Sequence, residues 1–128
     1  MVNLQETEAA LASFVQDRVD GVYFAPAPLF FVERKQVVAL AARYRLPAVH
    51  SFAEFPQVGG LMSYGISVAE RSYEAGRYTG LILNGANPAD LPVRRLTKFG
   101  LVINMRTARA LGLSVPESFL ALADEVIE

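Results

Sequence analysis

Apolar positions along the chain follow two spacings, one typical of amphipathic helices and one typical of short buried strands. Apolar side chains recur on one helical face in residues 9–15, and residues 3–6 have the Asn-x-x-Glu spacing of a capping box. A Ser-x-x-Glu spacing at 67–70 precedes a second helix, which we expect to end at the Asn-Gly pair 84–85. These signals predict a capped helix at each of the two places.

Short apolar runs between the helices are too brief to be helical, and they predict strands at residues 22–25, 48–52, 61–66 and 101–103. We expect the first run to be buried on both faces of a sheet. A single helix is predicted from Pro28 to Tyr44, because proline suits a first helical turn. Strand, helix and strand in this order predict a parallel crossover unit.

The rest of the chain is predicted as a loop at 54–60, an extended connector at 86–98, a helix from Asn104 to Gly112 and a last helix from Pro116 through Leu122. The order of elements predicts one α/β domain over residues 1–128, with a mostly parallel sheet and helices on both faces. Because the first helix would normally follow a strand, we also expect an unpaired sheet edge.

Composition excludes several classes of function. The 12 basic and 13 acidic residues leave a net charge of −1 and are scattered, so we expect no nucleic-acid partner. With no cysteine and one histidine, the chain offers no disulfides and could assemble only a carboxylate-rich zinc site, so we expect no metal and no cofactor. The acidic N-terminus has no basic region followed by an apolar run, so no signal peptide is expected in this chain.

Candidate binding residues lie in the loops after the first three predicted strands, at 25–31, 51–55 and 64–67, because ligands of open α/β sheets bind beyond the carboxyl ends of the strands. Exposed amides at helix N-termini would receive a carboxylate, and aromatic side chains would flank an apolar body. Ordinary packing beneath loops is the alternative for each aromatic residue. The predicted ligand-binding residues are Pro26, Ala27, Pro28, Phe30, Phe52, Glu54, Tyr64 and Ser67.

Covalent chemistry is not expected. His50, the single histidine, lies at the end of a strand, and it is interpreted as a structural residue or as an acid, a base or a lone ligand at the rim of the crevice. No serine lies in a Gly-x-Ser-x-Gly elbow, and no partner for His50 or Glu54 follows from spacing, so an enzyme is the weaker interpretation. Gly76 and Gly80 match no phosphate loop and are expected to allow close helix packing.

Three segments carry a resemblance to a known family, namely Gly60-Leu61-Met62-Ser63-Tyr64-Gly65, residues 75–85 and residues 87–128. They resemble the C-terminal part of substrate-binding proteins of ABC importers, a family that includes receptors for aromatic amino acids. The resemblance implies one lobe of a two-lobed, type I periplasmic-binding-protein architecture. Since family members are usually more than twice as long, it also implies that the chain is a fragment.

The resemblance also implies a function. A small-molecule solute such as an amino acid would be captured by hinge closure in a periplasmic or extracytoplasmic compartment and delivered to a membrane permease. Relatives commonly carry Asp or another polar side chain after the first strand, whereas this chain has Ala25-Pro26-Ala27-Pro28, which leaves backbone amides as the local donors. The alternative is a homodimeric interaction module that buries its free sheet edge or its crevice surface.

Overall fold

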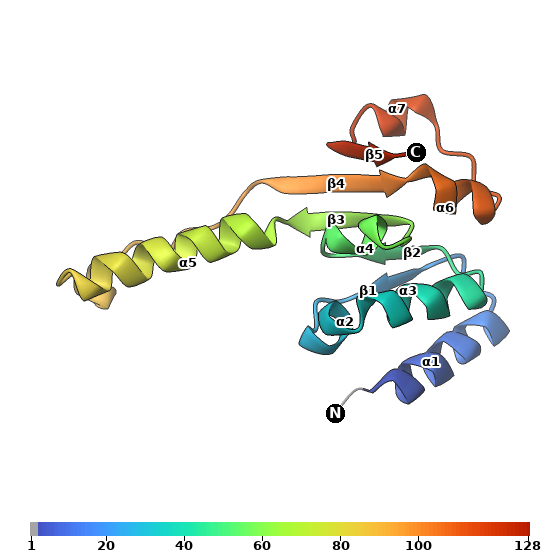
Figure 1. The fold of residues 1–128 in the computed structure, drawn as a ribbon, viewed down its shortest axis with the longest axis horizontal. Helices are drawn as coiled ribbons and strands as arrows, with labels where there is room; N and C mark the ends of the chain where they lie inside the picture. The colour runs from blue at the N-terminus through green and yellow to red at the C-terminus, as the bar shows by residue number, and fades with distance from the viewer. Residues whose placement is uncertain (1–2) are drawn as a thin grey trace.

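The computed structural model describes residues 3–128, so that Met1 and Val2 lie outside the described part, and it contains a five-stranded sheet (Figure 1). The strands follow one another across the sheet in chain order: β1 (Val22–Phe24), β2 (Ala48–His50), β3 (Met62–Ile66), β4 (Phe99–Asn104) and β5 (Glu125–Ile127). The β1–β2, β2–β3 and β4–β5 pairs are parallel, and the β3–β4 pair is antiparallel. The predicted α/β fold with a mostly parallel sheet is therefore confirmed.

The helices of the described residues are α1 (Leu4–Gln16), α2 (Pro28–Val32), α3 (Arg34–Arg43), α4 (Glu54–Gln57), α5 (Val68–Leu83), α6 (Met105–Ala110) and α7 (Glu117–Leu120). A 3₁₀ turn, η1, spans Pro88–Asp90. Both halves of the predicted capping box of α1 are present, since the Asn3 side chain accepts from the Glu6 N–H at 2.8 Å and the Glu6 carboxylate accepts from the Asn3 N–H at 3.2 Å. The Ser67 hydroxyl likewise accepts from the Glu70 N–H at the start of α5, so both predicted helix starts are confirmed.

The main hydrophobic core lies between β1, β2 and the helices α1, α3 and α4. It is formed by Leu11, Phe24, Val37, Val38, Ala41, Leu46, Ala48 and Phe55, all of them buried. Each large apolar side chain buried in this way is worth about 1.5–3 kcal/mol relative to an exposed one. This core lies in the first half of the chain, where it joins β1 and β2 to α1 and α3.

Three predictions about the first half of the chain were wrong. The helix predicted from Pro28 to Tyr44 is broken at Glu33 into α2 and α3, and the break lets two aromatic residues of α2 pack against β1 and the loop after β2. The segment predicted as a loop at 54–60 begins with α4, whose Phe55 joins the core. β1 is not buried on both faces, because Tyr23 is 62% exposed.

The C-terminal segment also differs from the prediction. The last helix is a single turn, α7, and the chain then adds β5 at the edge of the sheet. Asp124 starts this strand pairing in two ways, since its carboxylate accepts from the Leu101 N–H at 2.7 Å and its own N–H donates to the Leu101 carbonyl at 2.9 Å. β5 is thus held by backbone groups of β4, which no local pattern in residues 116–128 indicates.

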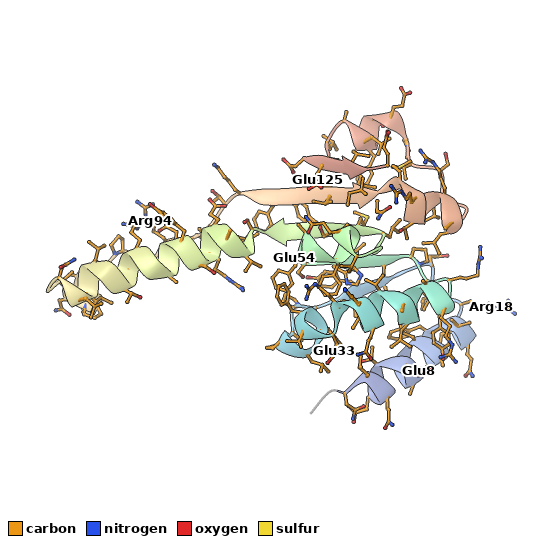
Figure 2. All side chains as sticks on the ribbon, viewed as in Figure 1. Glu8, Arg18, Glu33, Glu54, Arg94 and Glu125 are labelled. Atoms are coloured by element: carbon orange, nitrogen blue, oxygen red, sulfur yellow. The ribbon has the colours of Figure 1, made fainter. Side chains whose placement is uncertain are left out.

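α5 and the connector of residues 86–98 form an arm that projects away from the sheet (Figures 1 and 2). No residue of α5 is buried, and Tyr73 and Leu83 are 70% and 81% exposed. The connector returns alongside the helix, and the Tyr78 hydroxyl donates to the Pro92 carbonyl. Nothing in the described residues lies within 4 Å of a Cβ built at Gly76 or Gly80, so the close packing expected of these glycines is not made within this chain.

Candidate functional site

Two hollows lie beyond the carboxyl ends of the parallel strands. The first, of about 350 Å³, is here called the proline hollow and is lined by Pro26, Ala27, Pro28, Phe31, Phe52, Val68 and Arg71. The second, of about 220 Å³, is here called the tyrosine hollow and is lined by Tyr23, Pro26, Ser51, Phe52, Tyr64, Gly65, Ile66, Arg71 and Phe99. Pro26, Phe52 and Arg71 line both, so the two hollows adjoin and form one crevice.

Strand direction explains why these residues meet. β1, β2 and β3 run parallel, so the loops that follow Phe24, His50 and Ile66 emerge at the same sheet edge. β4 runs antiparallel to β3 and therefore begins at that edge, where Phe99 pairs with Ile66. α5 leaves β3 at the same edge, which brings its first turns beside the crevice (Figure 1). Open α/β sheets bind ligands in this position.

The walls of the crevice are mainly aromatic. Phe31 meets Phe52 edge to face with 5.4 Å between ring centroids, and Tyr64 stacks on Phe99 at 5.4 Å with the ring planes inclined by 21°. Gly65 passes close to the loop after β2, and a Cβ placed on it would overlap the Ser51 carbonyl oxygen. The floor of the tyrosine hollow therefore depends on a glycine at this position.

Few polar groups enter the crevice. The Tyr23 and Ser51 hydroxyls form a hydrogen bond of 2.7 Å in the tyrosine hollow. The guanidinium of Arg71 lies over the Phe52 ring, 5.8 Å from the centroid. The N-terminus of α5, with Val68 in its first turn, opens at the proline hollow and adds a partial positive charge there. The crevice is therefore apolar with a positive electrostatic contribution at one side.

The structure brings most, but not all, of the predicted binding residues together. Pro26, Ala27, Pro28, Phe52 and Tyr64 line the hollows. Phe30 instead meets Phe24 edge to face at 5.4 Å and lines a separate hollow of about 400 Å³ between α1 and β1. Ser67 caps α5, Glu54 begins α4, and neither lines the two hollows of the crevice.

Four residues that line the crevice lie outside the loops predicted at 25–31, 51–55 and 64–67: Tyr23, Val68, Arg71 and Phe99. Arg71 follows Ser67 by four residues, and residues at this spacing lie on the same side of a helix, so the capping signal of α5 could have identified it. Tyr23 was missed because its strand was expected to be buried on both faces. Val68 and Phe99 carried no signal beyond their closeness to strand ends. The remaining lining residues that were not predicted individually, Phe31, Ser51, Gly65 and Ile66, lie within the predicted loops.

His50 does not reach the crevice. Its ring is 1% exposed and stacks against Phe24 and Phe55, with centroid distances of 5.0 and 4.1 Å. Burial lowers the pKa of His50 to about 4, so the side chain is neutral near pH 7. Its structural interpretation is thus favoured over a role as an acid or base at the rim.

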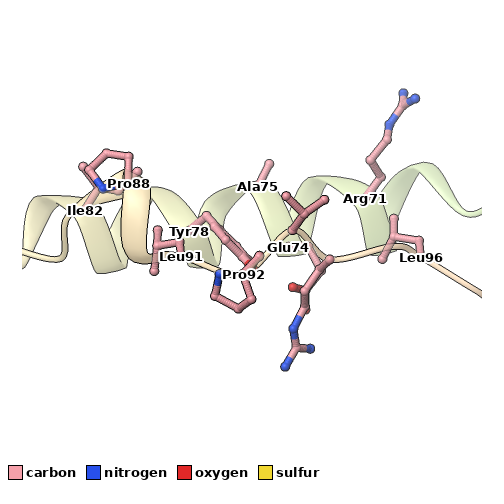
Figure 3. Close-up of a pocket in the computed structure, with 11 residues that line it drawn as sticks. Arg71, Glu74, Ala75, Tyr78, Ile82, Pro88, Leu91, Pro92 and Leu96 are labelled. Atoms are coloured by element: carbon pink, nitrogen blue, oxygen red, sulfur yellow. The ribbon is translucent and has the colours of Figure 1, made fainter.

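Within residues 3–128, no three histidine, aspartate or glutamate side chains gather in a way that would hold a metal ion. No helix of the described chain has both the length and the apolar character needed to cross a bilayer. A third hollow, of about 380 Å³, lies along the arm between α5 and the connector, where Tyr78, Leu91 and Pro92 line it (Figure 3). Figure 3 shows the Arg71 side chain extending from the start of α5, at one end of this hollow.

The sequence profile described as "ABC transporter substrate binding protein" matches residues 1–127. The chain belongs to this family. The resemblance seen in the sequence is therefore confirmed over almost the whole chain, and members of this substrate-binding family are generally components of transport, not enzymes. No curated protein sequence matches the chain significantly.

Solved structures of substrate-binding proteins and related chains share the fold. The ABC domain from Streptococcus pneumonia, solved in complex with L-Trp, has 28% sequence identity and a TM-score of 0.84, and the match covers 96% of this chain and 41% of that one. A conserved domain protein from Vibrio cholerae has 22% identity and a TM-score of 0.84, with 95% and 41% covered.

A third similar structure is the ligand-free, open form of a substrate binding protein with adhesive properties from Clostridium difficile. It has 22% identity and a TM-score of 0.63, with coverage of 99% of this chain and 42% of that one. The chain thus spans about two fifths of the length of these structures, as the partial resemblance implied.

Proposed function

We propose that the protein to which these residues belong captures a small molecule of amino-acid size outside the cytoplasmic membrane and delivers it to the permease of an ABC importer. The observation that carries the proposal is the apolar crevice at the carboxyl ends of β1, β2 and β3, found in a chain of the substrate-binding family. The aromatic walls suit a solute with an apolar or aromatic body. The similar domain from Streptococcus was solved in complex with L-Trp, which supports the same size class.

Capture would proceed by closure of two lobes over the solute. The chain leaves the sheet after Ile66 to enter α5 and returns to the sheet at Phe99, so two crossings lie side by side at the β3–β4 pair. The exposed apolar residues of α5, among them Tyr73, Leu81 and Ile82, would pack against the second lobe. Rotation about the two crossings would then open and close the crevice.

The crevice is proposed to bind its solute unchanged. The Ser51 hydroxyl lies in the tyrosine hollow, yet its hydrogen-bond partner is the Tyr23 hydroxyl, which is a poor general base near neutral pH. His50, the single histidine, is enclosed by Phe24 and Phe55 and does not line either hollow. A nucleophile and a base are therefore not brought together at the crevice by the described residues.

Calorimetric titration with a panel of amino acids and related small solutes tests the proposal. A two-lobed protein that contains these 128 residues should bind at least one solute with micromolar affinity, whereas residues 1–128 alone should bind a thousandfold more weakly, roughly, because half of the contact shell is missing. Phe52→Ala should weaken binding about tenfold, and Phe119→Ala, on α7, should leave it unchanged.

Two results would count against the proposal. Micromolar binding by the 128 residues alone would show that the crevice needs no second lobe. A concentration-dependent dimer in sedimentation, combined with no solute binding by the two-lobed protein, would instead favour the homodimeric module through the free edge of β1.

A further inference from the structure

Arg71 is the one charged side chain that lines either hollow of the crevice within residues 3–128, and it lines both. The other lining residues are apolar, apart from the hydroxyls of Tyr23, Ser51 and Tyr64. A single cation at the boundary of two apolar hollows gives the crevice one strong anchor point, and the sign of its charge selects the ligand.

The guanidinium of Arg71 forms no ion pair with a carboxylate among the described residues. Arg77, further along α5, differs in this respect, because it forms an ion pair with Glu74 at 3.0 Å. Instead, Arg71 lies over the face of Phe52, which keeps the guanidinium beside the wall of the crevice. Its five N–H donors are thus left for a ligand.

No acidic side chain offsets this charge inside the crevice, as far as the described residues extend. Glu54 and Glu70, the carboxylates nearest to the crevice loops along the chain, line neither hollow. An ammonium group on the solute would find no counter-charge in this lobe and would depend on the second lobe for one. A carboxylate would meet Arg71 and could also accept from the hydroxyl pair of Tyr23 and Ser51.

We propose that Arg71 binds the carboxylate of the solute, and that the solute is a small molecule with an aromatic or branched apolar body and one carboxylate. This inference rests on the proposed function and names the solute class of the same crevice. The carboxylate would accept two N–H bonds from the planar guanidinium, a geometry that lysine does not provide. The apolar body would lie against Phe31 and Phe52 in the proline hollow.

Titration of the two-lobed protein with phenylpropanoate, L-phenylalanine and phenethylamine tests both parts of the proposal, because the three share one aromatic body and differ in charge. Phenylpropanoate should bind about tenfold or more tightly than phenethylamine, which lacks the carboxylate, and L-phenylalanine shows whether an added ammonium group is tolerated. Arg71→Gln should weaken phenylpropanoate binding about 10–100-fold, and Arg71→Lys should recover only part of the loss. Arg77→Gln is the matched control on the same helix and should stay within about twofold.

The possible outcomes separate the inference from the function on which it rests. Phenethylamine binding as tightly as phenylpropanoate would overturn the requirement for a carboxylate. If Arg71→Gln and the unchanged protein bind phenylpropanoate equally well while Phe52→Ala binds it more weakly, the role of Arg71 is overturned and the proposed function stands. If neither these compounds nor any solute of the wider panel binds, the proposed function fails, and this inference fails with it. Because Arg71 is exposed, unchanged circular dichroism is expected for both of its variants.

Discussion

The imidazole ring of His50 lies parallel to the phenyl ring of Phe55, with 4.1 Å between the ring centroids and 10° between the planes. Phe24 stacks on the same imidazole at 5.0 Å. Neither ring nitrogen of His50 has a hydrogen-bond partner among residues 3–128. An imidazolium in this apolar stack would lose its hydration without compensation, which explains why the pKa of His50 is lowered to about 4.

The buried histidine predicts a pH-dependent stability. In the unfolded chain His50 takes up a proton near its ordinary pKa of 6.5, whereas in the folded chain it does so only near 4. Protonation therefore favours the unfolded chain, so the stability is intact above pH 6.5 and falls as the pH is lowered from 6.5 towards 4. The full difference corresponds to about 3 kcal/mol.

Urea unfolding between pH 7 and pH 4.5 measures this effect. His50→Phe keeps a ring in the stack and removes the titrating group, so the difference between the two proteins isolates His50 from the carboxylates that titrate in the same range. The unchanged protein should lose more stability than the variant over this interval. Parallel pH profiles for the two proteins would show that His50 is not protonated selectively on unfolding. His50→Gln serves the same comparison if the phenyl ring is too large for the site.

The helix starts and strands that were predicted correctly are those that neighbouring residues in the sequence specify. The caps at Asn3 and Ser67 and the apolar runs of β1 to β4 are set by neighbouring residues, so they could be recognised without a fold. β5 could not, because it forms only when the backbone of Leu101 is available to pair with Asp124, and the two residues are distant in sequence. The break at Glu33 likewise depends on contacts of the α2 aromatic residues with other elements.

The residues of the candidate site also divide into those that local signals indicate and those that depend on contacts between distant segments. The rule that ligands bind beyond strand ends was sufficient to indicate Pro26 and Phe52, which directly follow or end a predicted strand, and Tyr64, which lies near the end of one. Arg71 depends on the direction in which α5 leaves the sheet, and Phe99 depends on the antiparallel return of β4. Both are consequences of three-dimensional arrangement. The residue that gives the crevice its charge was thus the one that strand-end reasoning could not reach.

Gly65→Ala should disturb the crevice and destabilise the fold. The added Cβ would overlap the Ser51 carbonyl oxygen, which belongs to the backbone and cannot rotate away, so β3 or the loop after β2 must shift. We expect a loss of about 1–3 kcal/mol in unfolding free energy, as for other overpacked sites, together with weaker solute binding. Chemical denaturation and calorimetric titration of the same preparation measure the two effects.

Gly76→Ala is the matched control for Gly65→Ala. Nothing described lies within 4 Å of a Cβ at Gly76, and alanine has the higher helix propensity, so residues 1–128 should gain up to about 1 kcal/mol. Equal effects of the two substitutions would contradict the close approach of β3 to Ser51. Destabilisation by Gly76→Ala in a two-lobed protein but not in residues 1–128 alone would indicate that α5 packs tightly against the second lobe.

Asn104→Ala should be among the most destabilising single changes outside the main core. Asn104 is 6% exposed and makes two bonds from one side chain: its amide donates to the Pro56 carbonyl at 2.9 Å, and its carbonyl oxygen accepts from the Thr107 N–H at 3.2 Å. The residue thereby joins α4, β4 and the start of α6. Loss of a helix cap costs about 1 kcal/mol, and loss of the buried hydrogen bond to the Pro56 carbonyl, which still accepts from the Gly59 N–H, adds about 1 kcal/mol, so we expect a total of about 2 kcal/mol in urea unfolding.

Two further variants separate the bonds of Asn104. Asn104→Asp keeps the acceptor for Thr107 but replaces the donor to Pro56 with an oxygen, so it should be at least as destabilising as Asn104→Ala, because two acceptors would then face each other. Asn87→Ala removes an exposed cap of η1, where the side chain accepts from the Ala89 N–H, and should cost less than about 1 kcal/mol. Near-normal stability of Asn104→Asp would mean that the helix cap alone accounts for the role of Asn104. In that case α4 is held against β4 by the packing of Phe55 and Pro56, and not by the hydrogen bond from Asn104 to the Pro56 carbonyl.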